Sequence, residues 1–247
     1  MLPLDGIKVV ELAQNLAGPF CAEILSHLGA EVIKVEKPKI GDDARHWGKL
    51  LSEDAGASFN AINLNKKSIV LDLKDPAERD RLLKVIDDAD VVVQNMLPGV
   101  LEKMGLGAKD LMARNSRLIY CSVSAYGNAG PKKNEPGYEP IVQAFSAMCM
   151  MSGWPGGPPI RMGTQVLDHG SAMWAAIGVL SADARWRGDD VDVLAVDDRG
   201  GGGAKGHVLR MHAQAAREVQ RGEHADAEGV FPGLQFLVPA GFGDADE

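Results

Sequence analysis

The 247-residue chain has few cysteines, few aromatic residues and no long apolar run. Its three cysteines, Cys21, Cys121 and Cys149, lie far apart without metal-ligand spacing, and an odd number cannot all pair. We therefore expect buried free thiols, as in a reducing cytoplasm, and no metal site. No segment approaches the roughly 18 apolar residues that span a bilayer, and the N-terminus lacks the pattern of a signal peptide. These absences predict a cytoplasmic protein without a membrane partner.

Positive charge is also in short supply. Lys and Arg number 26 against 34 Asp and Glu, which gives a formal net charge of −8. Such an acidic balance argues against a general nucleic-acid binder and favours a small-molecule ligand. With 45% hydrophobic residues, the chain can bury a core of one large domain or two small ones.

What is present begins with a strand-helix-strand pattern. Residues 7–12 and 31–36 are predicted strands, and residues 19–28 form a predicted helix with Pro19 at its first position. The loop of residues 14–18 would then lie at the carboxyl end of a strand and the start of a helix, where free backbone N–H groups favour an anion or a nucleotide. It lacks G-x-G-x-x-G, and such a loop is common in α/β proteins that bind nothing there, so the loop alone does not predict a ligand.

The pattern continues with unequal spacing. Asp75, Pro76 and Glu78 supply a cap, a proline at the first helical position and a capping-box glutamate for a helix through Ile86. Further strands are predicted over residues 68–73, 90–95 and 117–123. Strands that alternate with helices predict an α/β fold, a Rossmann-like mostly parallel sheet with helices on both faces.

Several cations follow or flank the predicted strand ends. They are Lys37, Lys39, Arg45, Lys66, Lys67 and Lys74. Together they suit a ligand with several phosphates, although each one alone is better explained as a solvated surface side chain.

A long series of ordered motifs carries a resemblance to a known family. They are Leu4-Asp5-Gly6-Ile7-Lys8-Val9-Val10-Glu11, Ala17-Gly18-Pro19, residues 28–36, Gly41-Asp42, residues 63–68, residues 71–74, residues 90–95, Pro98-Gly99, Met104-Gly105, residues 124–127, residues 136–139 and residues 157–159. In these positions the chain resembles the family III CoA-transferases, which include formyl-CoA transferase, the carnitine CoA-transferases and the α-methylacyl-CoA racemases. The matches extend over about 180 residues and keep their order.

The resemblance implies a large domain that binds CoA and uses an aspartate as nucleophile, with Asp168 in that position. An acyl-CoA and a small carboxylic acid would be the substrates, with no permanently bound cofactor. Asp168 precedes an apolar helix expected at residues 172–180, so the helix dipole and free N–H groups would keep its carboxylate ionised with a low pKa. Without the family context, an ordinary helix cap is the alternative. The implied CoA contacts are Gln14, Asn15, Ala17, Lys37, Leu71, Lys74, Asn95, Met96, Lys103 and Met104.

Two departures from the family bear on function. Lys37 and Lys103 stand where arginine is familiar in formyl-CoA transferase, so they supply charge without a bidentate fork. The racemases have Gly-His where this chain has Gly137-Tyr138, and tyrosine is a poor base near neutral pH, which favours transferase over racemase. Four side chains, Met148, Met150, Met151 and Trp154, could line an acyl pocket, but ordinary core packing is the preferred interpretation.

The resemblance ends at about Ala182. We expect residues 1–182 to form the CoA-binding domain and residues 183–247 to be a non-homologous, partly disordered tail that arises from a reading-frame shift. The family's interlocked homodimer would then lack its closing parts, leaving an altered dimer or a catalytically inactive remnant that binds CoA.

A rival interpretation takes the tail as a dinucleotide site. Residues 191–196 would be a strand, residues 201–206 fit G-x-G-x-x-G, and residues 207–220 would be a helix. Even without such a site, residues 208–219 could form a helix.

Overall fold

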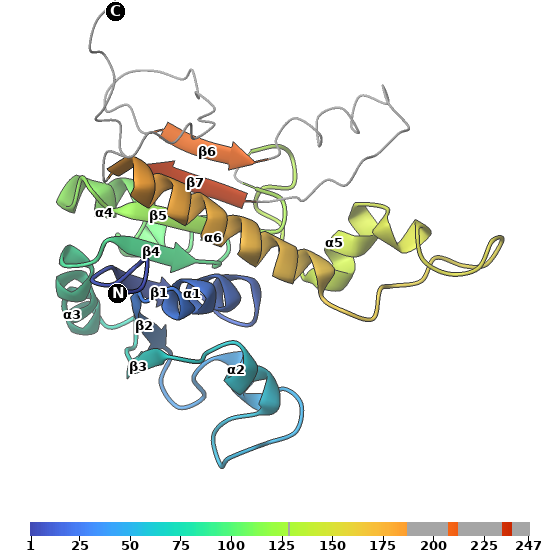
Figure 1. Cartoon of the computed structure of the whole chain (residues 1–247), viewed down its shortest axis with the longest axis horizontal. Helices are drawn as coiled ribbons and strands as arrows, with labels where there is room; N and C mark the ends of the chain where they lie inside the picture. Colours follow the sequence, from blue (N-terminus) through green and yellow to red (C-terminus); the bar gives the residue numbers. More distant parts are fainter. Residues whose placement is uncertain (128, 187–206, 212–233, 239–247) are drawn as a thin grey trace, which may run out of the picture.

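The computed structural model describes residues 1–127, 129–186, 207–211 and 234–238. Its described strands form one sheet with the order β3-β2-β1-β4-β5-β7-β6 (Figure 1). The strands are β1 (Lys8–Leu12), β2 (Glu31–Glu36), β3 (Lys66–Val70), β4 (Val91–Gln94), β5 (Ile119–Val123), β6 (His207–Met211) and β7 (Leu234–Val238).

The first five strands pair in parallel. β1 lies between β2 and β4, with Val9 opposite both Val32 and Val91, and β4 pairs with β5. Only β6 and β7 run antiparallel to their neighbours. The predicted mostly parallel sheet is therefore confirmed. The order of the strands reverses between β1 and β4, since the chain adds β2 and β3 on one side of β1 and β4 and β5 on the other. In such a sheet, this reversal opens a crevice at the carboxyl ends of the strands, where ligands collect.

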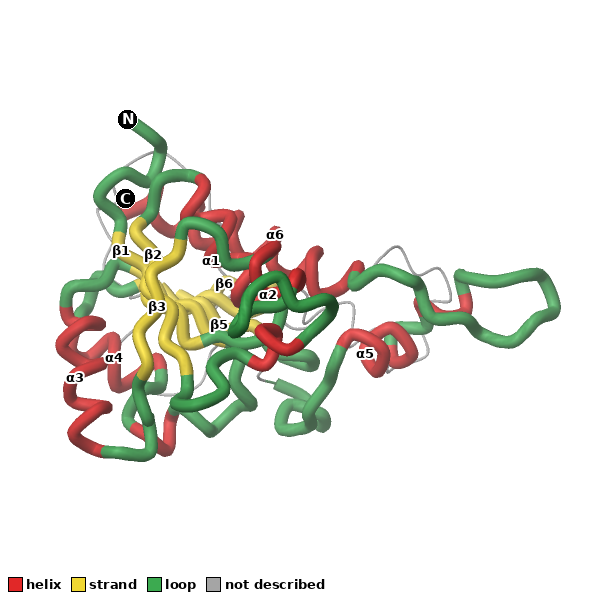
Figure 2. Tube along the Cα trace, turned by 90° about the horizontal axis from the view of Figure 1, so that it is seen from below, coloured by secondary structure: helices red, strands yellow, loops and turns green. Residues whose placement is uncertain are grey.

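Helices cover both faces, as predicted. They are α1 (Ala17–His27), α2 (Ala57–Ala61), α3 (Pro76–Asp87), α4 (Ala108–Arg114), α5 (Glu139–Phe145) and α6 (Val166–Trp186), with short 3₁₀ turns at Asp43–His46, Glu102–Met104 and Met148–Met150. On one face Val9 packs with buried side chains of α1 and α6, while on the other Val10 packs with Leu82 of α3 and Leu111 of α4. Figure 2 shows the sheet between these two helical layers.

Local signals place the elements with small errors. Asp75 caps α3 as predicted, since its Oδ1 accepts a hydrogen bond from Ala77 N at 2.9 Å. Glu78 instead accepts a hydrogen bond from the backbone of Asp72, so the expected capping box is wrong. α1 begins at Ala17, which makes Pro19 its third residue and not its first. β3 begins at Lys66, two residues earlier than predicted, because it pairs with β2 from Val32 onward.

Part of the tail that was predicted to be helical is a strand in the structure. Residues 207–211 form β6, which pairs with β7 and so extends the sheet, where the rival dinucleotide interpretation and the alternative helix both required helical residues. The predicted strand at 191–196 and the Gly201–Gly206 motif lie outside the described residues. The division at residue 182 stays a prediction.

The segment around α5 extends away from the sheet (Figure 1). Three of the methionine and tryptophan side chains expected to pack in a core are exposed there, with Met150 at 69%, Met151 at 78% and Trp154 at 85%. The core-packing interpretation is therefore wrong for these three, because the segment has no second layer of described residues over it. Within the described ranges, no helix is long and apolar enough to cross a membrane, and no group of His, Cys, Asp and Glu could hold a metal ion.

Candidate active site

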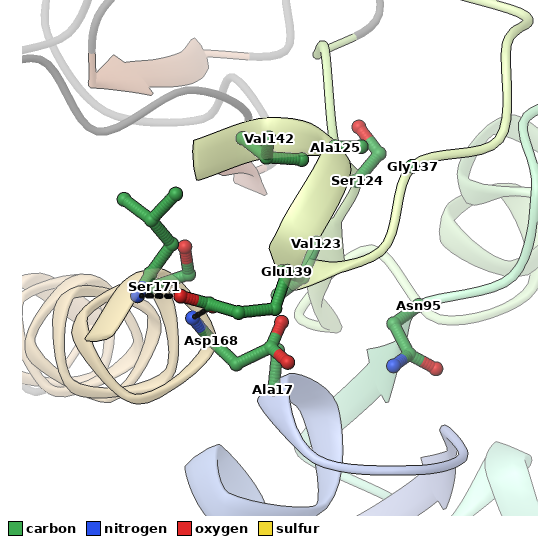
Figure 3. A pocket seen from close by; sticks show the side chains of 11 residues that line it. Ala17, Asn95, Val123, Ser124, Ala125, Gly137, Glu139, Val142, Asp168 and Ser171 are labelled. Atoms are coloured by element: carbon green, nitrogen blue, oxygen red, sulfur yellow. Dashed lines mark hydrogen bonds between the residues drawn. The ribbon is translucent and has the colours of Figure 1, made fainter. Parts of the chain in front are cut away.

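A cavity of about 90 Å³ lies where β1, β4 and β5 end, at the edge that the parallel sheet predicts for a ligand. Asp168 reaches it from the first turn of α6, and Figure 3 shows its carboxyl group directed toward Ala17 at the start of α1. The lining residues are Ala17, Asn95, Val123, Ser124, Ala125, Gly137, Glu139, Val142, Leu167, Asp168 and Ser171.

Glu139 caps α6, the role the sequence suggested for Asp168. Its Oε2 accepts a hydrogen bond from Asp168 N at 2.7 Å, and its Oε1 accepts one from Leu167 N at 3.1 Å. Gln143 Nε2 also donates to Oε1 at 2.6 Å. Glu139 is 6% exposed, so this bonded carboxylate fixes the start of the helix that carries Asp168 (Figure 3).

The expected low pKa of Asp168 is wrong. The pKa of Asp168 is raised to about 6, first by burial and then by the nearby charge of Glu139, while His169 offsets part of the rise. The free N–H groups that were expected to hold the charge are bonded to Glu139 instead. Asp168 is still mostly ionised near neutral pH, but its charge is held in a place that disfavours it.

A second cavity, of about 200 Å³, lies at the carboxyl ends of β2 and β3. Most of its lining is apolar, while Lys37 and Lys74 place two cations at its wall. Its lining residues are Leu12, Gln14, Val35, Glu36, Lys37, Leu71, Asp72, Leu73, Lys74, Met96, Val100, Leu101 and Met104. An apolar slot with a few cations suits a flat heteroaromatic group that carries phosphates.

The loop between β1 and α1 connects the two cavities. Gln14 lines the larger one and Asn95 lines the smaller one. The two residues are bonded to each other twice, since Gln14 N donates to Asn95 Oδ1 at 2.8 Å and Asn95 Nδ2 donates to Gln14 O at 2.7 Å. A long ligand could therefore occupy both cavities only by passing this pair.

Most of the predicted site residues line one of the two cavities. Ala17, Asn95 and Asp168 line the smaller one. Gln14, Lys37, Leu71, Lys74, Met96 and Met104 line the larger one.

Asn15 and Lys103 line neither cavity. Lys103 is exposed on the 3₁₀ turn at Glu102–Met104. Asn15 turns its backbone N–H to Asp42 Oδ1 at 3.0 Å, and its own Oδ1 is buried without a hydrogen-bond partner among the described residues.

The cluster of cations is only partly available to a ligand. Arg45 pairs with Glu36 at 2.6 Å, Lys66 with Glu11 at 2.8 Å and Lys67 with Glu31 at 2.6 Å, so these three serve the protein's own carboxylates. Lys37 pairs with Asp43 at 2.6 Å while it lines the larger cavity.

The sequence did not single out Glu139 as a site residue. Its bonding partners at the start of α6 lie 28 and 29 positions along the chain, beyond any local motif. Glu139-Pro140 at the start of a helix was the one available signal, and it marks a helix start and not a partner. Ser124, Ala125, Gly137 and Ser171 lie at the cavity for the same long-range reason.

Comparison with known proteins gives a consistent result. The model of CoA-transferase family III matches residues 4–197, past the point where the sequence resemblance was expected to end. The chain is 40% identical over 200 residues to the acetyl-CoA:oxalate CoA-transferase of Acetobacter aceti, which covers 79% of the chain and 51% of that protein. It is 39% identical over 175 residues to the succinyl-CoA:glutarate CoA-transferase of Mus musculus, covering 71% of the chain and 40% of that protein.

The fold comparison agrees. A crystal structure of a CaiB/BaiF family protein from Brucella suis superposes with a TM-score of 0.71 at 38% identity, covering 76% of this chain and 51% of that one. The chain thus spans about half the length of the curated relatives it matches. With a family model that covers most of its length and several relatives near 40% identity, the chain belongs to CoA-transferase family III.

Proposed function

We propose that the chain is a CoA-transferase that moves CoA between an acyl-CoA and a carboxylic acid through a covalent intermediate on Asp168. The observation that carries this proposal is the position of the Asp168 carboxyl group, in a small cavity at the start of α1 and one hydrogen-bonded residue pair away from an apolar, lysine-lined cavity. The relatives' names support the reaction type.

The chemistry begins at the thioester. An Asp168 carboxylate oxygen attacks the acyl carbonyl carbon, the C–S bond breaks, and a mixed anhydride and the CoA thiolate form. The thiolate then attacks the Asp168 carboxyl carbon and releases the donor acid as a carboxylate, which leaves an aspartyl-CoA thioester. The acceptor carboxylate repeats the two steps in reverse order, so that a new acyl-CoA leaves and Asp168 is restored.

The cavity wall, the start of α1 and Glu139 each assist these reaction steps. Asn95 and Ala17 form part of the wall beside the reacting carboxyl group. α1 begins there without a side-chain cap, so its N-terminus favours the negative charge that develops on oxygen during each attack. Glu139 holds the backbone that carries Asp168.

The larger cavity is our proposed site for the nucleotide part of CoA. Leu71, Met96 and Met104 offer apolar surface to the adenine ring, and Lys37 and Lys74 offer charge to its phosphates. The pantetheine arm would pass Gln14 and Asn95 to bring the thioester to Asp168. CoA would then be a substrate and not a permanently bound cofactor.

The alternative functions require different groups in the Asp168 cavity. A racemase needs a base and an acid on either side of the substrate, and the titratable side chains that line the Asp168 cavity within the described residues are Asp168 and Glu139. Tyr138, at the position where racemases have histidine, is 63% exposed. This arrangement favours transfer over racemisation. Racemisation and CoA binding without turnover are the two alternatives to transfer.

We also propose that the active form is a homodimer. Apolar side chains are exposed on α5 and α6, with Ile141 at 51%, Phe145 at 47%, Met173 at 50% and Ile177 at 47%. Patches of this kind mark contact surfaces more often than free ones. Light scattering coupled to gel filtration would give the molar mass, and a stable monomer would contradict this proposal.

Intact-protein mass spectrometry tests the function. The protein is incubated with succinyl-CoA or acetyl-CoA and trapped with hydroxylamine or borohydride, alongside Asp168→Asn and the surface control Asp87→Asn. In the wild type and in Asp87→Asn we expect a CoA adduct before trapping, a hydroxamate after hydroxylamine and an alcohol after borohydride, and none of these in Asp168→Asn. CoA binding without an adduct would leave a binding protein, and an adduct that persists in Asp168→Asn would overturn the assignment of the nucleophile.

A further inference from the structure

A balanced set of four charged side chains is buried beside the loop between β1 and α1. Lys34 Nζ lies 2.6 Å from Glu11 Oε1 and 2.7 Å from Asp42 Oδ2, while Lys66 Nζ lies 2.8 Å from Glu11 Oε2. Glu11 is 0% exposed, and Lys34 and Asp42 are 1% exposed. We refer to Glu11, Lys34, Asp42 and Lys66 as the buried charge cluster.

The buried charge cluster holds the backbone of the loop. Lys34 Nζ donates to Ala13 O at 3.1 Å, and Asp42 Oδ1 accepts from Asn15 N at 3.0 Å. Lys66 Nζ donates to Pro19 O at 2.7 Å, in the first turn of α1.

Gln14 lies between Ala13 and Asn15 and makes two hydrogen bonds with Asn95, which directly follows β4. Ala13, Gln14 and Asn15 are therefore each fixed by a side chain from a different segment, namely β2, the turn after β4 and the turn after β2.

The loop needs this support because its conformation is strained and its packing is close. Asn15 has a φ of 67°, in the left-handed region that non-glycine residues rarely adopt. A Cβ at Gly18 would lie 2.3 Å from Ala13 Cβ, so the two sides of the loop are in direct contact. Ala17, two residues after Asn15, forms part of the wall of the Asp168 cavity. A displacement at Asn15 would thus move the wall beside the reacting carboxyl group.

Stability alone is a weak reason for such a cluster. Buried ion pairs replaced by apolar side chains of similar size often leave a protein as stable or more so, because removing charges from water is costly. Burial opposes the charge of Lys34, yet Glu11 and Asp42 outweigh it and raise the pKa of Lys34, so Lys34 stays charged.

We infer that Asp42 and Lys34 are positioning residues for the acyl-transfer step, which hold the loop so that Ala17 and the start of α1 face Asp168. They touch no reacting atom. This inference rests on the proposed function for its kinetic part, while the claim that the pair holds the loop stands on the contacts alone.

The test compares Asp42→Ala, Asp42→Asn and a control, Tyr120→Phe. Tyr120 is 2% exposed on β5 and its hydroxyl donates a hydrogen bond to Leu106 O at 3.2 Å, so Tyr120→Phe weakens the core without removing a hydrogen bond to the loop. Each protein is measured at the same interval below its own thermal midpoint, which matches them for global stability. Hydrogen exchange of a peptide covering residues 12–20 reports on the loop, and single-turnover mass spectrometry with acyl-CoA reports on adduct formation at Asp168.

We expect Asp42→Ala to speed exchange in the loop and to slow adduct formation by about 10- to 100-fold relative to Tyr120→Phe, as misplaced reacting groups do. CoA affinity should change by less than about 3-fold, because Gln14 is the one residue of the loop among those that line the larger cavity, so the loss would be in the chemical step. Asp42→Asn keeps an oxygen for Asn15 N and should fall between the wild type and Asp42→Ala.

The outcomes separate the two ideas. If Asp42→Ala leaves exchange in the loop at the level of Tyr120→Phe, the pair does not hold the loop and this inference is wrong. Equal loss of adduct rate in Asp42→Ala and Tyr120→Phe would also overturn it, since a general loss of stability would then explain both. If the wild type forms no adduct on Asp168, the proposed function fails whatever the exchange data give.

Discussion

Replacing Glu139 with glutamine perturbs the geometry and the charge of the candidate site together. The glutamine side chain has one acceptor oxygen in place of two. That oxygen is best placed where Leu167 N and Gln143 Nε2 donate, so the NH₂ group faces Asp168 N and cannot accept its hydrogen bond. One backbone N–H loses its acceptor in a partly buried place, which costs about 1–3 kcal/mol. Because that N–H belongs to Asp168 itself, we expect the adduct to form about 10- to 100-fold more slowly.

The charge removed by Glu139→Gln gives an independent readout. Burial is the larger cause of the raised pKa of Asp168 and Glu139 is the smaller one. Losing Glu139's charge should therefore move the acid limb of the pH profile to lower pH, by less than about 1 pH unit. A merely destabilised protein would lose rate without this movement.

Single-turnover rates measured across pH, with urea denaturation for stability, test both parts of the Glu139→Gln prediction. Glu135→Gln is the matched control, since Glu135 lies four residues earlier in an exposed pair with Lys132 at 2.8 Å. Solvent screens that exposed pair, so its loss should leave the rate and the pH profile unchanged. A Glu139→Gln protein with wild-type rate and an unmoved acid limb would refute the claim that Glu139 positions Asp168 and acts on its charge.

Further outcomes follow from the same geometry. The adduct rate of the wild type should fall as pH drops through about 6, because Asp168 must be ionised to attack, and a flat profile between about pH 4.5 and 7.5 would contradict the raised pKa. Because the folded pKa of Asp168 is raised, its contribution to stability is greatest below the unfolded pKa and is lost as pH rises through about 6. Asp168→Asn should therefore be more stable than wild type by about 3 kcal/mol near pH 7.5 and equal to it near pH 4, as urea denaturation would measure. Lys74→Ala should weaken CoA binding about 3- to 10-fold at low salt and less at high salt, as calorimetry would measure, because its charge lies at the wall of the larger cavity.

The arrangement of the strands could be predicted because it depends on local patterns. β-branched and apolar runs such as 90–95 mark buried parallel strands, and turn or cap residues such as Asp75 mark the helices between them. Once the order of strands is known, ligand residues can be assigned to the carboxyl ends without knowing any contact. That is why Gln14, Leu71 and Asn95 were found.

The charges could not be assigned in the same way. Lys66 was placed among the cations near the ligand edge, but the register of β3 against β2 brings it to the amino end of its strand, where it meets Glu11. Free N–H groups were expected to hold the charge of Asp168, but Glu139 binds those groups from another element. Both errors arise because an ion pair or a cap can be satisfied by a distant residue, and sequence spacing does not encode which one.

The raised pKa of Asp168 fits a covalent mechanism better than the low pKa expected from a helix cap. A carboxylate stabilised by several backbone N–H groups would be a poor nucleophile, because attack would sacrifice those bonds. Asp168 instead carries a charge that is disfavoured by burial and by the neighbouring Glu139. When Asp168 becomes an anhydride or a thioester, that charge leaves the residue, and both costs are relieved. Near pH 7.5 more than about nine-tenths of Asp168 is still ionised, so the site keeps the reactive form while favouring its acylation.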